Sequence, residues 1–333
     1  MPSRNASFEL EGWDFQINAA IFMVLKDVKN IERVRLEGKL QDIELTKNDK
    51  TKIYAQAKFV HGYDDDRNVI KNLRSALISL KESLLADPSC ISIIYCTNSP
   101  NPLKKDKSFY SGITNVSYSE LPEDHKEVID DIIKKECQGD FDCSRLRIQI
   151  IPFHGDDLDN RYKVIKEAVN EFLAELGLGE SGFSKLLLPI WQNQVFKNGT
   201  IPNTSVEIKK SELVWPLIFL VTDQASDAYI AEELDQDVYE DVKAKYRNLV
   251  QNSVDQFEFY TKVVGDFNDF KFEGNSREKR HNFIAEKWRD YLIKIQGEIF
   301  MSDEEQEYVI KMILYKILVK RSEIDRIKKG VGL

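Results

Sequence analysis

The sequence predicts a mixed α/β fold, with helices packed on a sheet of parallel and antiparallel strands, followed by a mainly α-helical domain. Three observations predict it. The first is the order of the early elements, which reads as one helix, three strands, a second helix and a fourth strand. The second is that two later Ile-rich runs alternate with helices, as the buried strands of a mixed sheet do. The third is that helical periodicity dominates after Gly182.

The first helix is expected to open at residues 12–16, because apolar residues then recur at helical spacing. Residues 31–36 alternate apolar and charged side chains, which indicates a half-buried strand. Two further strands are expected at residues 41–46 and 52–60. Asn48 and Asp49 give the turn signal between them.

The remaining elements follow from the same periodicities. Helices are expected at residues 66–85, 122–136 and 161–176, and buried strands at 89–96 and 146–153, with a long loop at 97–116. Residues 177–182 end the last of these helices and read as a linker. Beyond it lie an apolar block at 186–195, a β-like stretch at 204–221, and helices at 231–250, 255–264, 277–296 and 303–328. We therefore expect one domain over residues 1–180 and a mainly helical regulatory or interaction domain over 181–333.

Composition limits the class of protein. A chain of 333 residues with 42% hydrophobic residues is long and apolar enough for about two folded domains. The net charge of −9 argues against a surface covered with nucleic-acid-binding residues. The first 60 residues nevertheless carry 10 Lys and Arg against 9 Asp and Glu, so the excess acid lies further along the chain.

The sequence also indicates where the protein works. Its first residues have no apolar segment typical of a secretory signal, and the longest apolar run, residues 213–221, is too short to span a bilayer. We expect a soluble, cytoplasmic protein. Its four cysteines lack the spacing and histidine partners of a zinc site, so they are expected to be reduced structural thiols. No P-loop motif is present.

One hairpin concentrates the polar side chains that carry chemistry. Gln56 and Lys58 are two residues apart in a predicted strand and therefore leave the same face. The preceding hairpin strand brings Asp42 alongside them. A carboxylate, an amide oxygen and an ammonium at one sheet edge can hold a divalent metal beside a phosphodiester. The alternative is that these residues are only the solvated side of an amphipathic hairpin.

The same residues carry a resemblance to a known family. Phe15 and Gln16 follow Gly12 in the first helix, Glu37 and Gly38 precede Asp42, and Gln56-Ala57-Lys58 closes the series. In this order and strand context, the first half of the chain resembles the PD-(D/E)xK nuclease superfamily. More narrowly, it is similar to the Cap-type double-stranded DNA endonuclease domain of bacterial anti-phage systems. Gln56 departs from the superfamily's usual Asp or Glu, which removes one negative charge from the metal site. We expect this either to weaken metal affinity or to shift dependence onto Glu37 and Glu44.

The resemblance implies a Mg²⁺-dependent (or Mn²⁺-dependent) endonuclease that hydrolyses double-stranded DNA. Asp42, Gln56 and the Ala57 carbonyl would be metal ligands, with Glu44 as a further ligand on the same strand face as Asp42. Lys58 would position or activate the attacking water. Glu37 completes the candidate catalytic set, and either Glu37 or Gln16 would hold a water at the metal.

Basic residues outside the hairpin are weaker candidates. His61 lies just past the third strand, and Lys104, Lys105 and Lys107 lie in the long loop. All four are candidate contacts to the DNA backbone, although isolated charges on loops are more often simply solvated. The acidic run at residues 64–66 directly precedes a helix and reads more simply as its N-cap than as a metal site.

Chain size and the helical tail resemble the nuclease effector subunit of Lamassu-type defence complexes. That likeness implies an SMC-like ATPase and a small accessory subunit as partners, which hold the nuclease inactive until a trigger releases it. It also implies a homo-oligomer in the active state and no membrane association. The rival hypothesis is a non-catalytic adaptor that keeps the nuclease fold as a scaffold for protein contacts.

Overall fold

The computed structural model describes residues 6–62, 67–105, 112–137, 141–226, 236–252, 256–294 and 302–333. The chain divides into two compact units. The first comprises Met1–Lys210 with Gly332, and the second Ser211–Val331 with Leu333.

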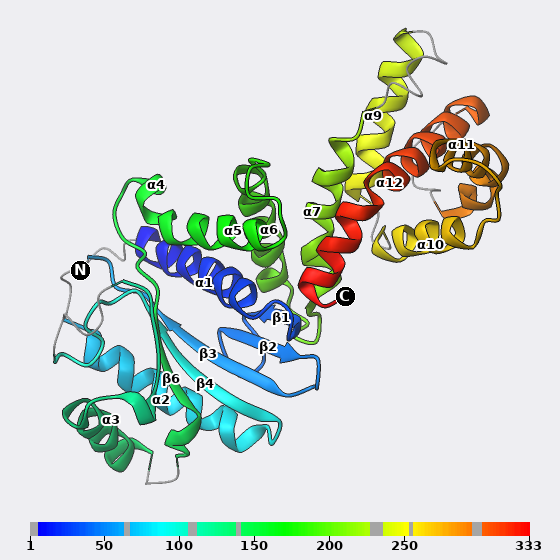
Figure 1. Cartoon of the computed structure of the whole chain (residues 1–333). Helices are drawn as coiled ribbons and strands as arrows, with labels where there is room; N and C mark the ends of the chain where they lie inside the picture. The colour runs from blue at the N-terminus through cyan, green and yellow to red at the C-terminus, as the bar shows by residue number, and fades with distance from the viewer. Residues whose placement is uncertain are drawn as a thin grey trace. The chain divides into compact units, whose positions relative to one another are not determined.

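The first unit is built on a seven-stranded sheet of order β5-β6-β4-β3-β2-β1-β7 (Figure 1). β3 runs parallel to β4 and β4 parallel to β6, whereas the other neighbouring strands are antiparallel. The sheet is therefore mixed, as the sequence predicts. Its strands are β1 (Ile31–Leu36), β2 (Ile43–Lys47), β3 (Lys52–Lys58), β4 (Cys90–Thr97), β5 (Thr114–Ser117), β6 (Leu146–Ile150) and β7 (Ile208–Lys209).

Helices cover both faces of this sheet (Figure 1). On one face α1 (Ala6–Lys26), α5 (Lys163–Glu175) and α6 (Ser184–Thr200) pack against one another, and α1 and α6 contact β1. On the other face α2 (Val69–Ala86) packs on β3 and β4, with α3 (Glu123–Glu136) beside it. The shorter helices are α4 (Leu158–Arg161), η2 (Tyr118–Glu120) and η3 (Cys143–Arg145).

The order α1-β1-β2-β3-α2-β4 confirms the element order that the sequence predicts. The expected loop at residues 97–116 contains the start of a short edge strand, β5, which pairs with β6. The first unit also extends about 30 residues past the sequence-predicted boundary at residue 180. The reason is that α6 packs on α1 and β1, and β7 adds an edge strand to β1.

The second unit is helical over its described residues, as expected. It contains α7 (Lys210–Asp223), α9 (Gln236–Asn252), α10 (Gln256–Asp269), α11 (Ser276–Lys287), η4 (Trp288–Lys294) and α12 (Asp303–Val331). The 29-residue α12 is its central element and contacts α9, α10, α11 and η4. In the parts of the chain that the structure describes, no helix combines the length and apolarity needed to cross a membrane.

The β-like interpretation of residues 204–221 is wrong beyond the two residues of β7. Most of this stretch is α7, whose buried Val214, Leu217, Ile218 and Val221 recur at helical spacing. Apolar residues between them mask this stripe in the sequence, since a continuous apolar run does not distinguish a buried strand from a buried helix.

Candidate active site

The candidate site forms where β1, β2 and β3 meet a tight turn. The turn joins β1 to β2 and is closed by two backbone hydrogen bonds, from Glu37 N to Asp42 O at 2.7 Å and from Gly38 N to Gln41 O at 2.9 Å. Ile43 pairs with Ala55 as the last residue pair of the β2–β3 ladder. Asp42 therefore lies one residue past that ladder, beside the end of β3.

Asp42 continues the ladder with its side chain. Its Oδ2 accepts a hydrogen bond from Ala57 N at 2.9 Å and another from Gln56 Nε2. The side chain replaces a backbone acceptor at the point where β2 and β3 part, and this fixes the direction of the carboxylate. The structure thus brings Asp42 and Gln56 into contact, as the hairpin pattern predicts.

Glu37 lies close enough to Asp42 for the two carboxylates to repel each other. Burial is the largest cause of the raised pKa of both side chains, and the charge of Asp42 raises the pKa of Glu37 further. Lys58 opposes these shifts at both carboxylates, as do hydrogen bonds from Gln16 on α1. Two partly desolvated carboxylates therefore share the charge of Lys58.

Gln16 leaves an orphaned oxygen in this cluster. Its amide lowers the pKa of both carboxyl groups, whereas its Oε1 is buried and accepts no hydrogen bond from the described residues. An unpaired buried acceptor carries a desolvation cost that a cation would offset. Gln16 comes from α1, so the first helix and the hairpin both contribute side chains to this cluster.

Glu44 is placed beneath the turn. Its Oε1 accepts hydrogen bonds from Leu40 N at 2.7 Å and Gln41 N at 3.2 Å. A Cβ on Gly38 would lie 2.2 Å from the Glu44 side chain, so a larger residue there would force the Glu44 carboxylate out of its place. At least one oxygen of Glu44 therefore holds the turn, and its predicted role as a metal ligand is untested.

The donor set fits a hard divalent cation. Asp42 and Glu37 would supply carboxylate oxygens, and Gln16 and Gln56 would supply amide oxygens, with waters completing the shell of an ion such as Mg²⁺. Within the described residues, no group of three or more His, Cys, Asp and Glu side chains is placed to hold a metal. Such a site would consequently depend on amide oxygens. Ala57 uses its N–H here, and the role of its carbonyl remains a prediction.

The predicted DNA contacts are scattered. His61 is exposed, and its Nδ1 lies 2.8 Å from Glu11 Oε2 on α1. Lys104 and Lys105 are exposed in a turn after β4, where Lys104 has a φ of 55°. Lys107 lies outside the described residues, as does the acidic run at 64–66.

Sequence reasoning missed Arg35. The alternating pattern of residues 31–36 suggests that its side chain faces solvent, but Arg35 is 1% exposed. Its guanidinium contacts the last turn of α6 and the residue that follows the helix, more than 160 residues away in sequence. No signal in the sequence alone links these segments.

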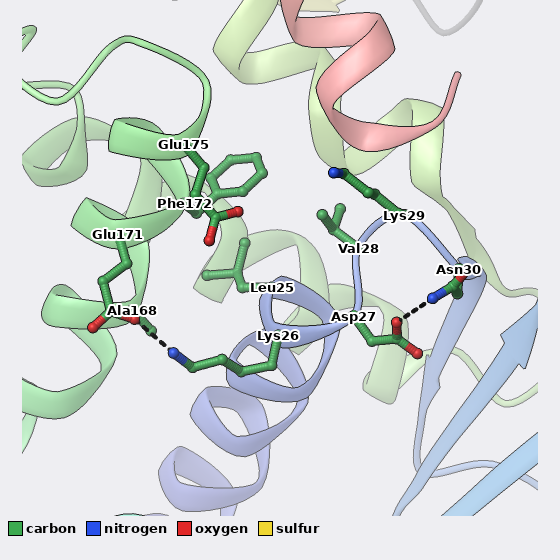
Figure 2. A pocket seen from close by; sticks show the side chains of 10 residues that line it. All are labelled: Leu25, Lys26, Asp27, Val28, Lys29, Asn30, Ala168, Glu171, Phe172 and Glu175. Carbon is green, nitrogen blue, oxygen red and sulfur yellow. Dashed lines mark hydrogen bonds and ion pairs between the residues drawn. The ribbon is translucent and has the colours of Figure 1, made fainter.

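A separate pocket of about 200 Å³ lies at the C-terminal end of α1 (Figure 2). Its apolar lining includes Leu25, Val28 and Phe172, and Lys26 pairs with Glu171 at its rim at 2.6 Å. It contains none of the site residues that the sequence predicts.

Comparisons with known proteins assign no family. No protein-family model and no curated protein sequence matches the chain. Among solved structures, the chain is similar to the Acinetobacter baumannii Cap4 SAVED/CARF-domain containing receptor with the cyclic trinucleotide 2'3'3'-cAAA. The TM-score is 0.36 and the identity 10%, over 64% of this chain and 45% of that one. The chain thus spans less than half of that receptor, and a likeness at this TM-score assigns no function.

Proposed function

We propose that the protein is a metal-dependent endonuclease that hydrolyses double-stranded DNA at the cluster around Asp42. The observation that carries the proposal is the meeting of Asp42, Glu37, Gln56 and Lys58 at the point where β2 and β3 part. We infer that the first unit is a PD-(D/E)xK-type core, since this cluster occurs within the order α1-β1-β2-β3-α2-β4.

The electrostatics of the cluster support this proposal over a solvated hairpin. Solvated carboxylates keep ordinary pKa values, whereas burial raises the pKa of both Asp42 and Glu37. Buried groups with mutually raised pKa values are typical of functional sites. The unpaired Gln16 Oε1 adds a further acceptor without a donor among the described residues.

The roles of the side chains follow from their chemistry. Asp42, Glu37 and the amide oxygens of Gln16 and Gln56 would hold Mg²⁺ or Mn²⁺, which supplies Lewis-acid stabilisation of charge on the phosphate oxygens when bound. Lys58 bears the positive charge that acts on both carboxylates. It would position the attacking water and offset the negative charge that develops on phosphate. Gln56 holds the Asp42 carboxylate in place through its amide N–H.

A cleavage assay with matched aspartate variants tests the proposal. Supercoiled plasmid is incubated with the full chain and Mg²⁺ or Mn²⁺, alone and together with its partner proteins. We expect wild type to nick or linearise the plasmid, and Asp42→Asn to abolish cutting. Asp27→Asn is the control, because Asp27 lies in the separate pocket near the end of α1 and should leave cutting unchanged.

Two results would contradict the proposal. Cutting by Asp42→Asn at the wild-type rate would place the chemistry elsewhere. Absence of cutting in every activated state, together with absence of Mn²⁺ binding by calorimetry, would favour a non-catalytic adaptor. The calorimetric arm matters because a nuclease that its partners hold inactive binds metal even when it does not cut.

We further propose that the second unit is the regulatory part. Unrestrained cutting of cellular DNA is lethal, so a cytoplasmic nuclease of this kind requires control, and the helical second unit is the available element. An SMC-like ATPase and a small accessory subunit are the proposed partners, with homo-oligomerisation in the active state. Co-purification of the chain with such an ATPase, encoded next to it, tests this step.

A further inference from the structure

Arg35 is a buried cation with an unusual set of partners. It lies on β1 and is 1% exposed. Its guanidinium donates to four backbone carbonyl oxygens: Asn198 O at 2.6 Å, Ile201 O at 2.7 Å, Val206 O at 3.1 Å and Glu37 O at 3.4 Å. A buried charge is costly, and well-packed apolar residues often stabilise a core equally well. The use of Arg at this position therefore indicates a role beyond packing.

The partners of Arg35 belong to two segments. Three are carbonyls in the last turn of α6 and the segment just after it, and the fourth is the carbonyl of Glu37, in the turn that carries the candidate site. The planar fork of Arg places several donors in fixed directions, which a lysine does not reproduce. Arg35 thus fastens one segment to the other.

Asn198 strengthens the same attachment. Its Oδ1 accepts a hydrogen bond from Leu36 N at 3.1 Å, and its Nδ2 donates to Val206 O at 2.8 Å. A Cβ on the next residue, Gly199, would lie 3.0 Å from side-chain atoms of both Leu36 and Trp13. Arg35 and Leu36, the last two residues of β1, are therefore both hydrogen-bonded to Asn198 at the end of α6, and Arg35 also bonds Glu37, the first residue of the turn.

Glu37 adopts a backbone conformation that needs such support. Its φ is 50°, in the left-handed region that non-glycine residues rarely occupy. Residues in such conformations persist only where the surrounding structure determines them from several sides. Here Arg35 holds the Glu37 carbonyl from the α6 side, and Glu44 holds Leu40 N and Gln41 N from beneath the turn.

We propose that Arg35, together with Asn198, is a positioning residue that holds the Glu37 carboxylate beside Asp42 for cation binding. The inference rests on the proposed function of this cluster. The bonds from Arg35 to the site go to backbone, so it acts through Glu37 and contacts no substrate. Without Arg35, we expect the turn to relax and the Glu37 carboxylate to move away from the proposed cation position beside Asp42.

A double-mutant cycle with Mn²⁺ as the probe tests the inference. Arg35→Lys keeps the buried charge but loses the fork, so we expect it to weaken Mn²⁺ binding by at least about tenfold, as loss of a residue that orients a metal ligand does. In a Glu37→Gln background the same change should alter Mn²⁺ binding by less than about twofold, because the two residues act as one unit. Isothermal titration calorimetry measures both.

Amide hydrogen exchange supplies a readout that does not require metal. In Arg35→Lys we expect the Glu37 and Gly38 amides, which close the turn, to exchange at least about tenfold faster. The Leu40 and Gln41 amides, which Glu44 holds, should keep their protection. Asn198→Ser is a second variant that removes the acceptor for Leu36 N without disturbing a buried charge.

The matched control is Lys316→Met in the second unit. Lys316 is another buried cation, 2% exposed, whose Nζ is 3.2 Å from Ala225 O. Its loss should lower stability and leave Mn²⁺ binding unchanged. The inference would be overturned if Arg35→Lys lowered Mn²⁺ affinity equally in the wild-type and Glu37→Gln backgrounds. It would also be overturned if hydrogen exchange at the Glu37 amide were unchanged. Absence of Mn²⁺ binding by wild type would instead refute the proposed function, and the exchange data would still decide whether Arg35 holds the turn.

Discussion

The two regions along α1 differ in how their charges are balanced. Near the end of the helix, Lys26 pairs with Glu171 at 2.6 Å, and both side chains are largely exposed, at 47% and 62% (Figure 2). Near its middle, Gln16 meets two carboxylates that share the charge of Lys58. The first region borders a pocket of about 200 Å³, but its ion pair is matched and solvated.

The comparison of these two regions indicates which kind of feature marks an ion-binding site in this chain. A pocket with a matched, solvated ion pair has little electrostatic reason to bind an ion. The Asp42 cluster is partly desolvated, and within the described residues Gln16 Oε1 accepts nothing. The unbalanced charges of the Asp42 cluster therefore make it the better candidate for the functional site, although a pocket is the usual first choice when such a site is sought.

Among the changes that test this comparison of two regions, the largest expected effect comes from Lys58→Met. This change removes the positive charge that acts on both Asp42 and Glu37 and keeps an unbranched apolar stem. We expect the rate of plasmid cleavage in Mg²⁺ to fall by at least about a hundredfold, as for the loss of one group that stabilises transition-state charge. Gel assays over time measure the rate. Lys26→Met is the matched control, and a similar fall in both variants would remove the distinction between the two regions.

The second prediction concerns pH and stability. Burial raises the pKa of Asp42 above its ordinary 3.8 and that of Glu37 above 4.5, so above about pH 4 these two groups hold more protons in the folded chain than in the unfolded chain. Stability contributed by these two groups is therefore present at low pH and lost as pH rises through the raised pKa values. Asp42→Asn combined with Glu37→Gln should abolish this loss.

Urea unfolding at a series of pH values measures that difference. The free energy of unfolding of the double variant should gain on that of wild type above about pH 4, and then level off once both wild-type carboxylates are ionised. Asp14, whose pKa burial also raises, is present in both proteins and cancels in the comparison. Added Mn²⁺ should stabilise wild type at pH 7 and leave the double variant unchanged. A constant difference across the pH range would contradict the prediction.

The third prediction concerns Gln56→Glu, which restores the acidic residue that the resemblance to PD-(D/E)xK nucleases leads one to expect at position 56. Gln56→Glu places a further carboxylate beside Asp42. We expect Mn²⁺ binding to tighten by about tenfold, because one more charged oxygen ligand faces the cation. The metal-free protein should lose stability, since the added carboxylate repels Asp42 and cannot donate the amide hydrogen bond. Calorimetry and thermal unfolding with and without Mn²⁺ measure the two effects, and weaker Mn²⁺ binding would contradict the metal-ligand role of position 56.

The sequence predicted the part of this site that follows from strand periodicity. Spacing by two places Gln56 and Lys58 on one face, and the hairpin register then brings Asp42 to Gln56. Arg35 escaped prediction because its burial depends on Asn198 and Val206, which no local pattern connects to β1. The role of Glu44 escaped for a similar reason. Period two predicts the face of a side chain, not that its carboxylate turns back to bind the amides of Leu40 and Gln41.

The smallest expected effect comes from the pocket. Lys26→Met removes the partner of Glu171, and exposed ion pairs of this kind contribute less than about 1 kcal/mol to stability. The methionine also keeps an unbranched apolar stem beside Phe22, whose ring centroid lies 5.5 Å from Lys26 Nζ. The midpoint of urea unfolding should therefore shift little, and plasmid cleavage and Mn²⁺ binding should match wild type. If Lys26→Met impaired cleavage while leaving the unfolding midpoint unchanged, the pocket would take part in function, and electrostatic imbalance would no longer separate the two regions along α1.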